Sequence, residues 1–63
     1  MAPIIGITVD NRHNTADSGT YGSAISYSRA VADAGALPVL LPHEPQRARE
    51  YVERCDGLIL SGG

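Results

Sequence analysis

The sequence contains a single cysteine, Cys55, among its 63 residues. One thiol cannot form an internal disulfide, so a reducing compartment is the simpler expectation. The two histidines, His13 and His43, are far from Cys55 and from each other in sequence, which gives no recognisable zinc spacing. We therefore expect neither a disulfide-stabilised scaffold nor a metal site.

Positive charge is also scarce, because 5 Lys and Arg residues stand against 7 Asp and Glu, for a formal net charge of −2. A nucleic-acid surface needs clustered Lys and Arg to neutralise phosphates, so no nucleic-acid partner is expected. Residues 44–54 mix both signs, as on a solvated helix face. The charged residues there are Arg47, Arg49, Arg54, Glu44, Glu50 and Glu53.

Long apolar runs are absent, and none approaches the roughly 20 residues of a membrane-spanning helix. The first residues, "MAPIIGITVD", lack the basic lead-in and the long apolar region of a signal peptide. The sequence therefore predicts a cytoplasmic protein without a membrane partner.

Three short apolar segments are predicted to be strands. Residues 3–9, "PIIGITV", show no polar alternation, as in a parallel strand buried on both faces. Residues 36–42, "ALPVLLP", form the second strand, with prolines placed where a strand tolerates them, near its start and at its end. The third strand, "LIL", follows the turn dipeptide Asp56-Gly57.

Two helices are expected between these strands, and residues 10–20 are predicted to be a polar loop. The first helix has apolar positions at helical spacing from Tyr21 onward and ends at Gly35. The second begins near Pro45. The expected inner positions are Tyr21, Ala24, Ile25, Val31 and Ala32 in the first helix, with Ser28 on the same face, and Ala48, Tyr51, Val52 and Cys55 in the second.

The resulting order β-α-β-α-β predicts an α/β fold with parallel strands joined by right-handed crossovers. The expected strand order is 2-1-3, with one helix on each face of the sheet. Strand three would then have an open edge, and a chain of this length buries only about 60% of its unfolded surface. We therefore expect residues 1–63 to be the amino-terminal part of a single, larger doubly wound domain, which requires the remainder of that domain.

Ligands of such sheets bind beyond the carboxyl ends of the strands. Gly62 and Gly63 follow strand three, where their backbone N–H groups could cradle a phosphate, stabilise an oxyanion or simply form a tight turn. No G-x-G-x-x-G or P-loop motif follows strand one. Asp10 and His13 follow strand one. Asp10 could bind substrate or cap the loop, and His13 could contact a ligand or face solvent.

His43, which lies between Pro42 and Glu44 at the start of the second helix, is interpreted as local structure. Cys55 falls on the apolar stripe of the second helix and is interpreted as a buried core residue. A nucleophilic cysteine needs a partly exposed, electropositive setting, which "ERCDG" does not suggest.

The segments "PIIGITVD", "AVADAGALPVLLP" and "CDGLILSGG" together resemble the amino-terminal part of class I glutamine amidotransferase-like hydrolases. The greatest similarity is to the gamma-glutamyl-gamma-aminobutyrate hydrolase (peptidase C26) family. The resemblance covers nearly the whole chain except residues 10–20. It implies a flavodoxin-like doubly wound sheet, a small gamma-glutamyl substrate and no cofactor, and it leaves homo-oligomer formation open.

The resemblance also implies a Cys-His-Glu triad whose thiolate attacks a gamma-glutamyl amide and forms a thioester that water hydrolyses. None of the three triad residues matches a position of this chain. Gly63 matches the family's glycine whose N–H is an oxyanion donor, and Gly62 shapes the turn. The 63 residues alone are therefore expected to be inactive.

A second interpretation belongs to a different class. Sugar-binding domains of the periplasmic-binding and repressor type also have strands similar to "IGITVD" and "DGLIL", and they catalyse nothing. Their second strand usually ends in small polar residues, whereas "LPVLLPHEP" ends in proline, as in the hydrolases. The second strand and the glycine pair therefore favour the hydrolase.

Overall fold

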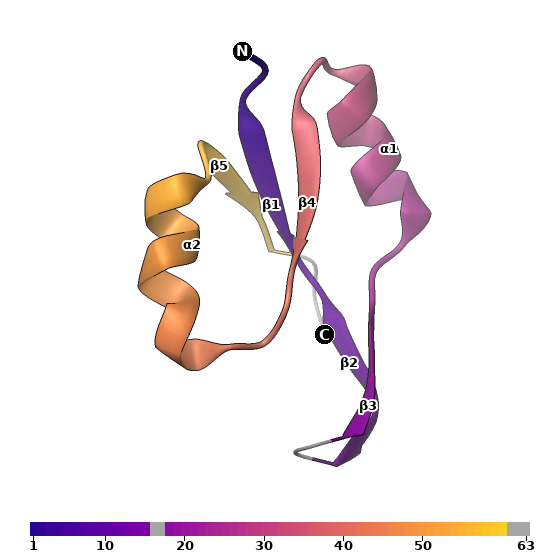
Figure 1. Ribbon diagram of the computed structural model, residues 1–63. Helices are drawn as coiled ribbons and strands as arrows, with labels where there is room; N and C mark the ends of the chain where they lie inside the picture. The colour runs from indigo at the N-terminus through magenta and orange to yellow at the C-terminus, as the bar shows by residue number, and fades with distance from the viewer. Residues whose placement is uncertain (16–17, 61–63) are drawn as a thin grey trace.

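The computed structural model describes residues 1–15 and 18–60 (Figure 1). Five elements form the expected β-α-β-α-β order: β1 (Ile4–Thr8), α1 (Ile25–Asp33), β4 (Leu37–Leu41), α2 (Ala48–Arg54) and β5 (Gly57–Ile59). A 3-10 turn, η1 (Pro45–Arg47), leads directly into α2, and two further strands, β2 (Asp10–Thr15) and β3 (Ser18–Gly22), follow β1.

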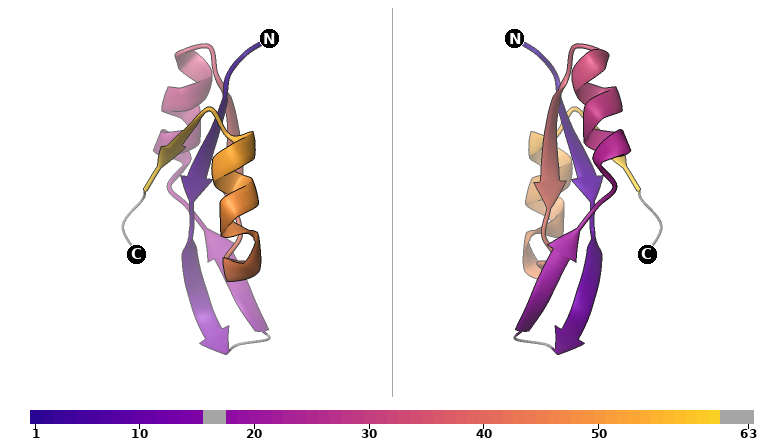
Figure 2. Two further views of the ribbon diagram at one scale, coloured as in Figure 1. Left: turned by 90° about the vertical axis from the view of Figure 1, so that its left-hand side faces the viewer. Right: turned by 90° about the vertical axis from the view of Figure 1, so that its right-hand side faces the viewer.

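The central sheet has the order β4-β1-β5, and both of its strand pairs are parallel. Ile4 aligns with Leu37 on one side of β1, and Ile7 aligns with Ile59 on the other. Figure 2 shows α1 and α2 on opposite faces of this sheet. The predicted strand order and the predicted arrangement of the helices are both confirmed, and the chain is an α/β structure with a parallel sheet.

Residues 10–20 are not the loop that their polarity predicts. Strands β2 and β3 pair antiparallel, with Asp10 opposite Gly22 and Arg12 opposite Thr20, and the register is irregular between Arg12 and Thr15. The hairpin projects beyond the carboxyl end of β1 (Figure 1). Pairing satisfies the backbone groups of a polar segment as well as water does, so polar composition did not distinguish hairpin from loop.

The hairpin also shortens the first helix, which begins at Ile25 rather than near Tyr21. Only Val31 of α1 is buried, while Ile25 is 72% exposed, so most of the predicted inner stripe is wrong. The helix ends as predicted. Gly35 has a φ of 91°, a conformation that favours glycine, and its N–H donates to the Ala32 carbonyl at 3.0 Å.

The inner stripe of α2 is wrong in part as well. Tyr51 is half-buried, but Val52 is 61% exposed and Ala48 is exposed. Pro45 begins the segment as expected, but as the first residue of the 3-10 turn η1. A 3-10 turn has about three residues per turn instead of 3.6, so it rotates the phase of the helix that follows it.

Asp56 joins the end of α2 to the start of the sheet. Its backbone N–H donates to the Ile4 carbonyl at 2.7 Å, and its carboxylate Oδ2 accepts a hydrogen bond from the Ile4 N–H at 2.8 Å. One residue therefore satisfies both backbone groups of Ile4 and holds β5 alongside the beginning of β1.

The core lies around β1 and its α1-facing side. The buried hydrophobic residues of the described part of the chain are Ile7, Val9 and Val31. Ile4 and Ile5 are only half-buried, so the expectation that both faces of residues 3–9 are buried holds for part of that segment. Large apolar side chains also face solvent, including Leu37, Leu40, Leu58 and Leu60.

Gly6 allows the α2-facing side of the sheet to pack closely. A Cβ atom at Gly6 would lie 2.8 Å from Leu41 Cδ1, 3.0 Å from Cys55 Sγ and 3.1 Å from Leu58 Cδ2. All three distances are shorter than ordinary van der Waals contacts, and the shortest, to Leu41 Cδ1, requires the neighbour to move. Side chains from β4, β5 and the end of α2 thus converge over a residue that has none.

We predict that Gly6→Ala destabilises the full-length protein by about 1–3 kcal/mol, because the added methyl group overpacks this point. The matched control is Gly57→Ala, whose Cβ would meet only Ile5 Cδ1, at 3.1 Å. Urea unfolding of both variants measures the difference. A Gly6→Ala variant as stable as Gly57→Ala would contradict the packing described for Gly6.

Candidate functional site

The carboxyl ends of the three parallel strands lie at one edge of the sheet. Thr8 aligns with Leu41 at the end of β4, and the preceding residue of β1, Ile7, aligns with Ile59 at the end of β5. The Thr8 hydroxyl donates to the Ile59 carbonyl at 3.4 Å, which ties the end of β5 to the end of β1. The segments that leave β1 and β5 therefore start side by side, as expected for the candidate site.

Asp10 lies at this edge as the first residue of β2, and it is half-buried. Its Oδ1 atom is buried without a hydrogen-bond partner in the described part of the chain, and so is the Ser23 hydroxyl. Asp10 Oδ1 makes no capping hydrogen bond to the described residues, and both predicted roles of Asp10, substrate binding and capping, remain predictions. A buried carboxylate oxygen without a donor costs free energy, so it calls for an explanation.

The other predicted site residues are not described. Gly62 and Gly63 lie outside the described residues, and so does the side chain of His13, although its backbone belongs to β2. Their roles in oxyanion stabilisation and substrate binding remain predictions.

His43 links the exits of two strands, which sequence reasoning did not anticipate. Its Nε2 atom lies 2.6 Å from the carbonyl oxygen of Val9, 34 residues away in sequence. The ring of Tyr21 packs edge-on against the imidazole, with centroids 5.0 Å apart and an interplanar angle of 61°. The only signal in the sequence was the pair of flanking prolines, Pro42 and Pro45, which restrict the backbone around His43.

A cavity of about 230 Å³ adjoins this histidine. Its walls are mostly apolar and come from the ends of β1 and β4, from η1 and from the start of α2. The lining residues include Thr8, Leu41, Pro42, His43, Pro45 and Tyr51. A hollow therefore lies at the same edge of the sheet as Asp10 and the end of β5.

A second cavity, of about 340 Å³, lies between α2 and the sheet. Ile4, Val39 and Leu41 line it on the sheet side, and Tyr51 and Cys55 line it on the other. Its charged lining residues, Arg47, Glu50 and Arg54, form the ion pairs along η1 and α2. It belongs to the packing of α2 and not to the candidate site.

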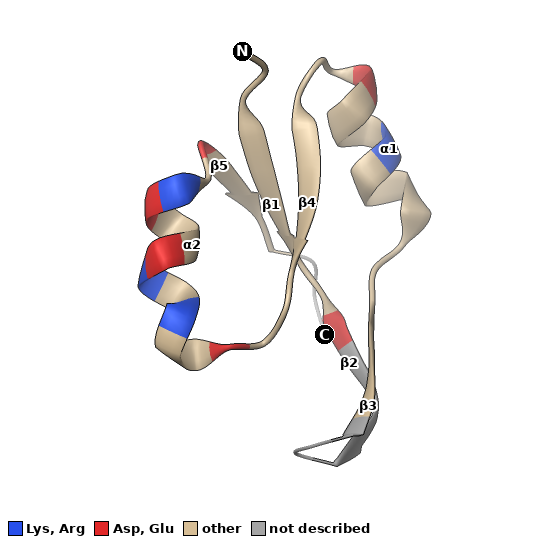
Figure 3. Cartoon of the chain, in the orientation of Figure 1, with Lys and Arg blue, Asp and Glu red and all other residues tan. Residues whose placement is uncertain are grey.

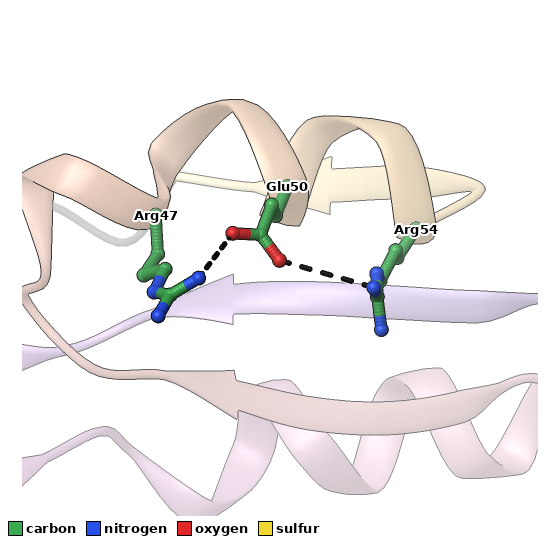
Figure 4. Close-up of polar contacts among 3 residues, drawn as sticks. All are labelled: Arg47, Glu50 and Arg54. Carbon is green, nitrogen blue, oxygen red and sulfur yellow. Dashed lines mark hydrogen bonds and ion pairs between the residues drawn. The ribbon is translucent and has the colours of Figure 1, made fainter.

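Among the described residues, charges of both signs alternate along η1 and α2 (Figure 3). Glu50 lies between two arginines, with Oε1 at 2.6 Å from Arg47 and Oε2 at 3.8 Å from Arg54 (Figure 4). The two arginine side chains are 66% and 81% exposed, so each ion pair contributes about 1 kcal/mol or less. This confirms the predicted solvated helix face.

Cys55 is half-buried, not fully buried as predicted, and it is the residue that follows α2. Its Sγ faces Gly6 and lines the cavity beneath α2. The short helix ends at Arg54, so Cys55 packs against the sheet from an extended backbone instead of from a helix turn. This thiol lies away from the edge where Asp10 and the end of β5 meet.

Within residues 1–15 and 18–60, no group of three or more His, Cys, Asp or Glu residues could hold a metal ion. None of the described helices has the length and apolar character needed to cross a membrane.

Comparison with known proteins gives a consistent result. The model of the peptidase C26 family matches residues 3–63. A Rickettsia prowazekii protein whose name describes it as glutamine amidotransferase-like is 33% identical over 66 residues, which cover 97% of this chain and 24% of that protein. Protein NtpR of Enterococcus hirae is 36% identical over 69 residues, which cover 100% of this chain and 28% of NtpR. No solved structure matches the chain.

The chain thus spans about a quarter of the length of these two relatives. Its matched part contains the whole β4-β1-β5 sheet and both helices.

We predict that Cys55→Ala in the full-length protein lowers the free energy of unfolding by about 1 kcal/mol, since a half-buried contact is lost. Cys55→Ser should cost more, because it places a hydroxyl against apolar side chains. Urea unfolding measures both effects. Catalytic activity should stay close to that of the wild type, and its loss by orders of magnitude in a folded Cys55→Ala variant would show that this thiol is a nucleophile.

Proposed function

The chain belongs to the peptidase C26 family, a glutamine amidotransferase-like group, and from this membership we propose that the full-length protein hydrolyses gamma-glutamyl amide bonds. The observation that carries the proposal is the family match over residues 3–63, which includes every strand of the parallel sheet. The gamma-glutamyl-gamma-aminobutyrate hydrolases are the members we propose as the nearest functional counterparts.

In the proposed mechanism a cysteine thiolate from outside this chain attacks the amide carbonyl carbon. The carbonyl π electrons move to oxygen, and the amine leaves with a proton from the triad histidine. Water then attacks the thioester and releases the gamma-glutamyl acid together with the thiol. The oxyanion that forms in each attack needs preorganised N–H donors.

Gly63 is proposed to supply one of these donors through its backbone N–H, and Gly62 is proposed to shape the turn. The arrangement at the end of β5 supports this role. Ile59 is the last residue of β5, and its carbonyl accepts a hydrogen bond from the Thr8 hydroxyl at the end of β1. The chain therefore leaves β5 from a fixed point. An oxyanion donor is useful only when it is held in place before the reaction.

Asp10 is proposed as a substrate contact, together with His13. A gamma-glutamyl group carries an ammonium, which donates hydrogen bonds, and an ionised carboxylate only accepts them. The Asp10 carboxylate has an oxygen without a partner among the described residues and lies at the proposed substrate edge. Binding of the substrate ammonium would give this carboxylate oxygen a hydrogen-bond donor and a neighbouring positive charge.

We further propose that residues 1–63 form the amino-terminal part of one amidotransferase-like domain. In the described part of the chain β5 pairs only with β1, so its outer edge is free. Leu58 and Leu60 are 42% and 78% exposed on that strand and just after it. A free strand edge with exposed apolar side chains is suited to pairing with a further strand.

A cytoplasmic location completes the proposal. The single cysteine of this chain forms no internal disulfide, and a catalytic thiolate keeps its activity only while it is reduced. The matched family is a peptidase family and the name of the Rickettsia relative describes it as glutamine amidotransferase-like, so both comparisons favour the hydrolase over the sugar-binding alternative.

We predict that Gly63→Pro in the full-length protein lowers kcat by about 10²–10³ while KM changes little, because an oxyanion donor acts mainly in the transition state. Proline has no backbone N–H. Gly63→Ala keeps the donor and should have a smaller effect. Hydrolysis of a gamma-glutamyl amide measures kcat and KM, and circular dichroism controls for the fold.

A folded Gly63→Pro variant with the kcat of the wild type would show that the Gly63 N–H does not stabilise the oxyanion. Tight binding of a sugar by a wild-type protein without amidase activity would instead support the binding-domain interpretation.

We also predict that an isolated peptide of residues 1–63 does not unfold cooperatively, because its sheet has a free edge and leaves Leu40, Leu58 and Leu60 exposed. Urea titration followed by circular dichroism should give a broad, gradual change. A sharp two-state transition in a monomeric peptide would show that this segment is an independent domain.

A further inference from the structure

The contact between His43 and Val9 specifies which imidazole nitrogen carries a proton. A backbone carbonyl can only accept a hydrogen bond, so at 2.6 Å Nε2 must carry the proton. His43 is then either the neutral tautomer with the proton on Nε2 or the imidazolium. Both forms donate to Val9, so the contact survives protonation of Nδ1.

The accepting carbonyl belongs to the last residue before Asp10. Val9 is 3% exposed, so its side chain is fixed in the core while its carbonyl accepts the hydrogen bond from His43. The Val9 carbonyl carbon is bonded to the Asp10 nitrogen, so holding this carbonyl sets the peptide plane from which Asp10 extends. His43 therefore acts on the position of Asp10 through a single peptide unit.

The histidine is itself held from two sides. The Tyr21 ring packs edge-on against the imidazole, and Tyr21 belongs to the strand that pairs with the beginning of β2. Pro42 and Pro45 restrict the backbone on either side of His43 and Glu44. Groups from the β4 exit and from the hairpin thus converge on the peptide that precedes Asp10.

We infer that His43 is a positioning residue for substrate binding, which donates its Nε2 proton to the Val9 carbonyl and thereby places the Asp10 carboxylate for the substrate ammonium. The inference rests on the proposed function for the identity of that substrate. The ammonium is remote from the amide carbon that reacts, so its contact is made equally in the ground state and in the transition state. Loss of His43 should therefore raise KM and leave kcat nearly unchanged.

Two substitutions at His43 separate the hydrogen bond from the packing in the full-length protein. His43→Phe keeps an aromatic ring against Tyr21 but removes the donor, and it should raise KM for a gamma-glutamyl amide about tenfold, as expected from a small misplacement of a binding group. His43→Gln restores an N–H donor at a similar reach and should bring KM most of the way back. Cys55→Ala is the control for reduced stability, because Cys55 does not line the cavity beside His43 and its loss is expected to leave activity unchanged.

Nuclear magnetic resonance tests the same inference without enzyme activity. With ¹⁵N-labelled histidine, neutral His43 should show the tautomer protonated on Nε2, and its signal is assigned by its loss in His43→Gln. The carboxyl ¹³C resonance of Asp10 should shift in His43→Phe and return toward its wild-type position in His43→Gln.

The possible results distinguish this inference from the proposed function. A neutral His43 protonated on Nδ1, or an Asp10 resonance and a KM that do not respond to His43→Phe, would overturn the positioning role even in an active enzyme. If the wild-type protein does not hydrolyse gamma-glutamyl amides, the proposed function fails. The tautomer and the Asp10 resonance then still decide whether His43 positions Asp10, but the substrate that Asp10 was proposed to bind is no longer supported.

Discussion

Strand β1 is hydrogen-bonded on both of its edges, and the remaining elements depend on that pairing. Asp56 satisfies both backbone groups of Ile4 at its beginning, and His43 donates a hydrogen bond to the carbonyl of Val9 just after its end. Between these points β4 and β5 align on either side. A shift of β1 by one residue would exchange its two faces and separate both end contacts at once.

The two faces of β1 differ in how they are filled. Ile7 and Val9 are buried, whereas Gly6 offers no side chain and receives Leu41, Cys55 and Leu58 instead. The face toward α2 is therefore packed by groups that reach across from other elements, and a cavity remains further along the same face. Much of the candidate site is likewise made of backbone: a carbonyl at Val9, a strand end at Ile59 and the exit of β4.

The order of the central elements could be predicted because continuous apolar runs and short connections leave few arrangements of a parallel sheet. Gly35 and Pro42 marked the ends of α1 and β4 through their local backbone preferences. The hairpin could not be predicted in the same way, because its polar residues pair through backbone groups that carry no compositional signal. The role of His43 could not be predicted for a related reason, because its hydrogen-bond partner is a backbone carbonyl 34 residues away in sequence.

The hairpin has a consequence for the order in which the chain folds. Asp10 and Gly22 are near neighbours in sequence, whereas Ile4 and Asp56 are 52 residues apart. Closing a short loop costs less chain entropy than closing a long one, and hairpins form within about 1–10 μs. We therefore expect β2 and β3 to associate before β1 finds β4 or β5. The early hairpin would carry Tyr21 with it, so one partner of the His43 ring is in place before the slower parallel pairing brings His43 to the end of β1.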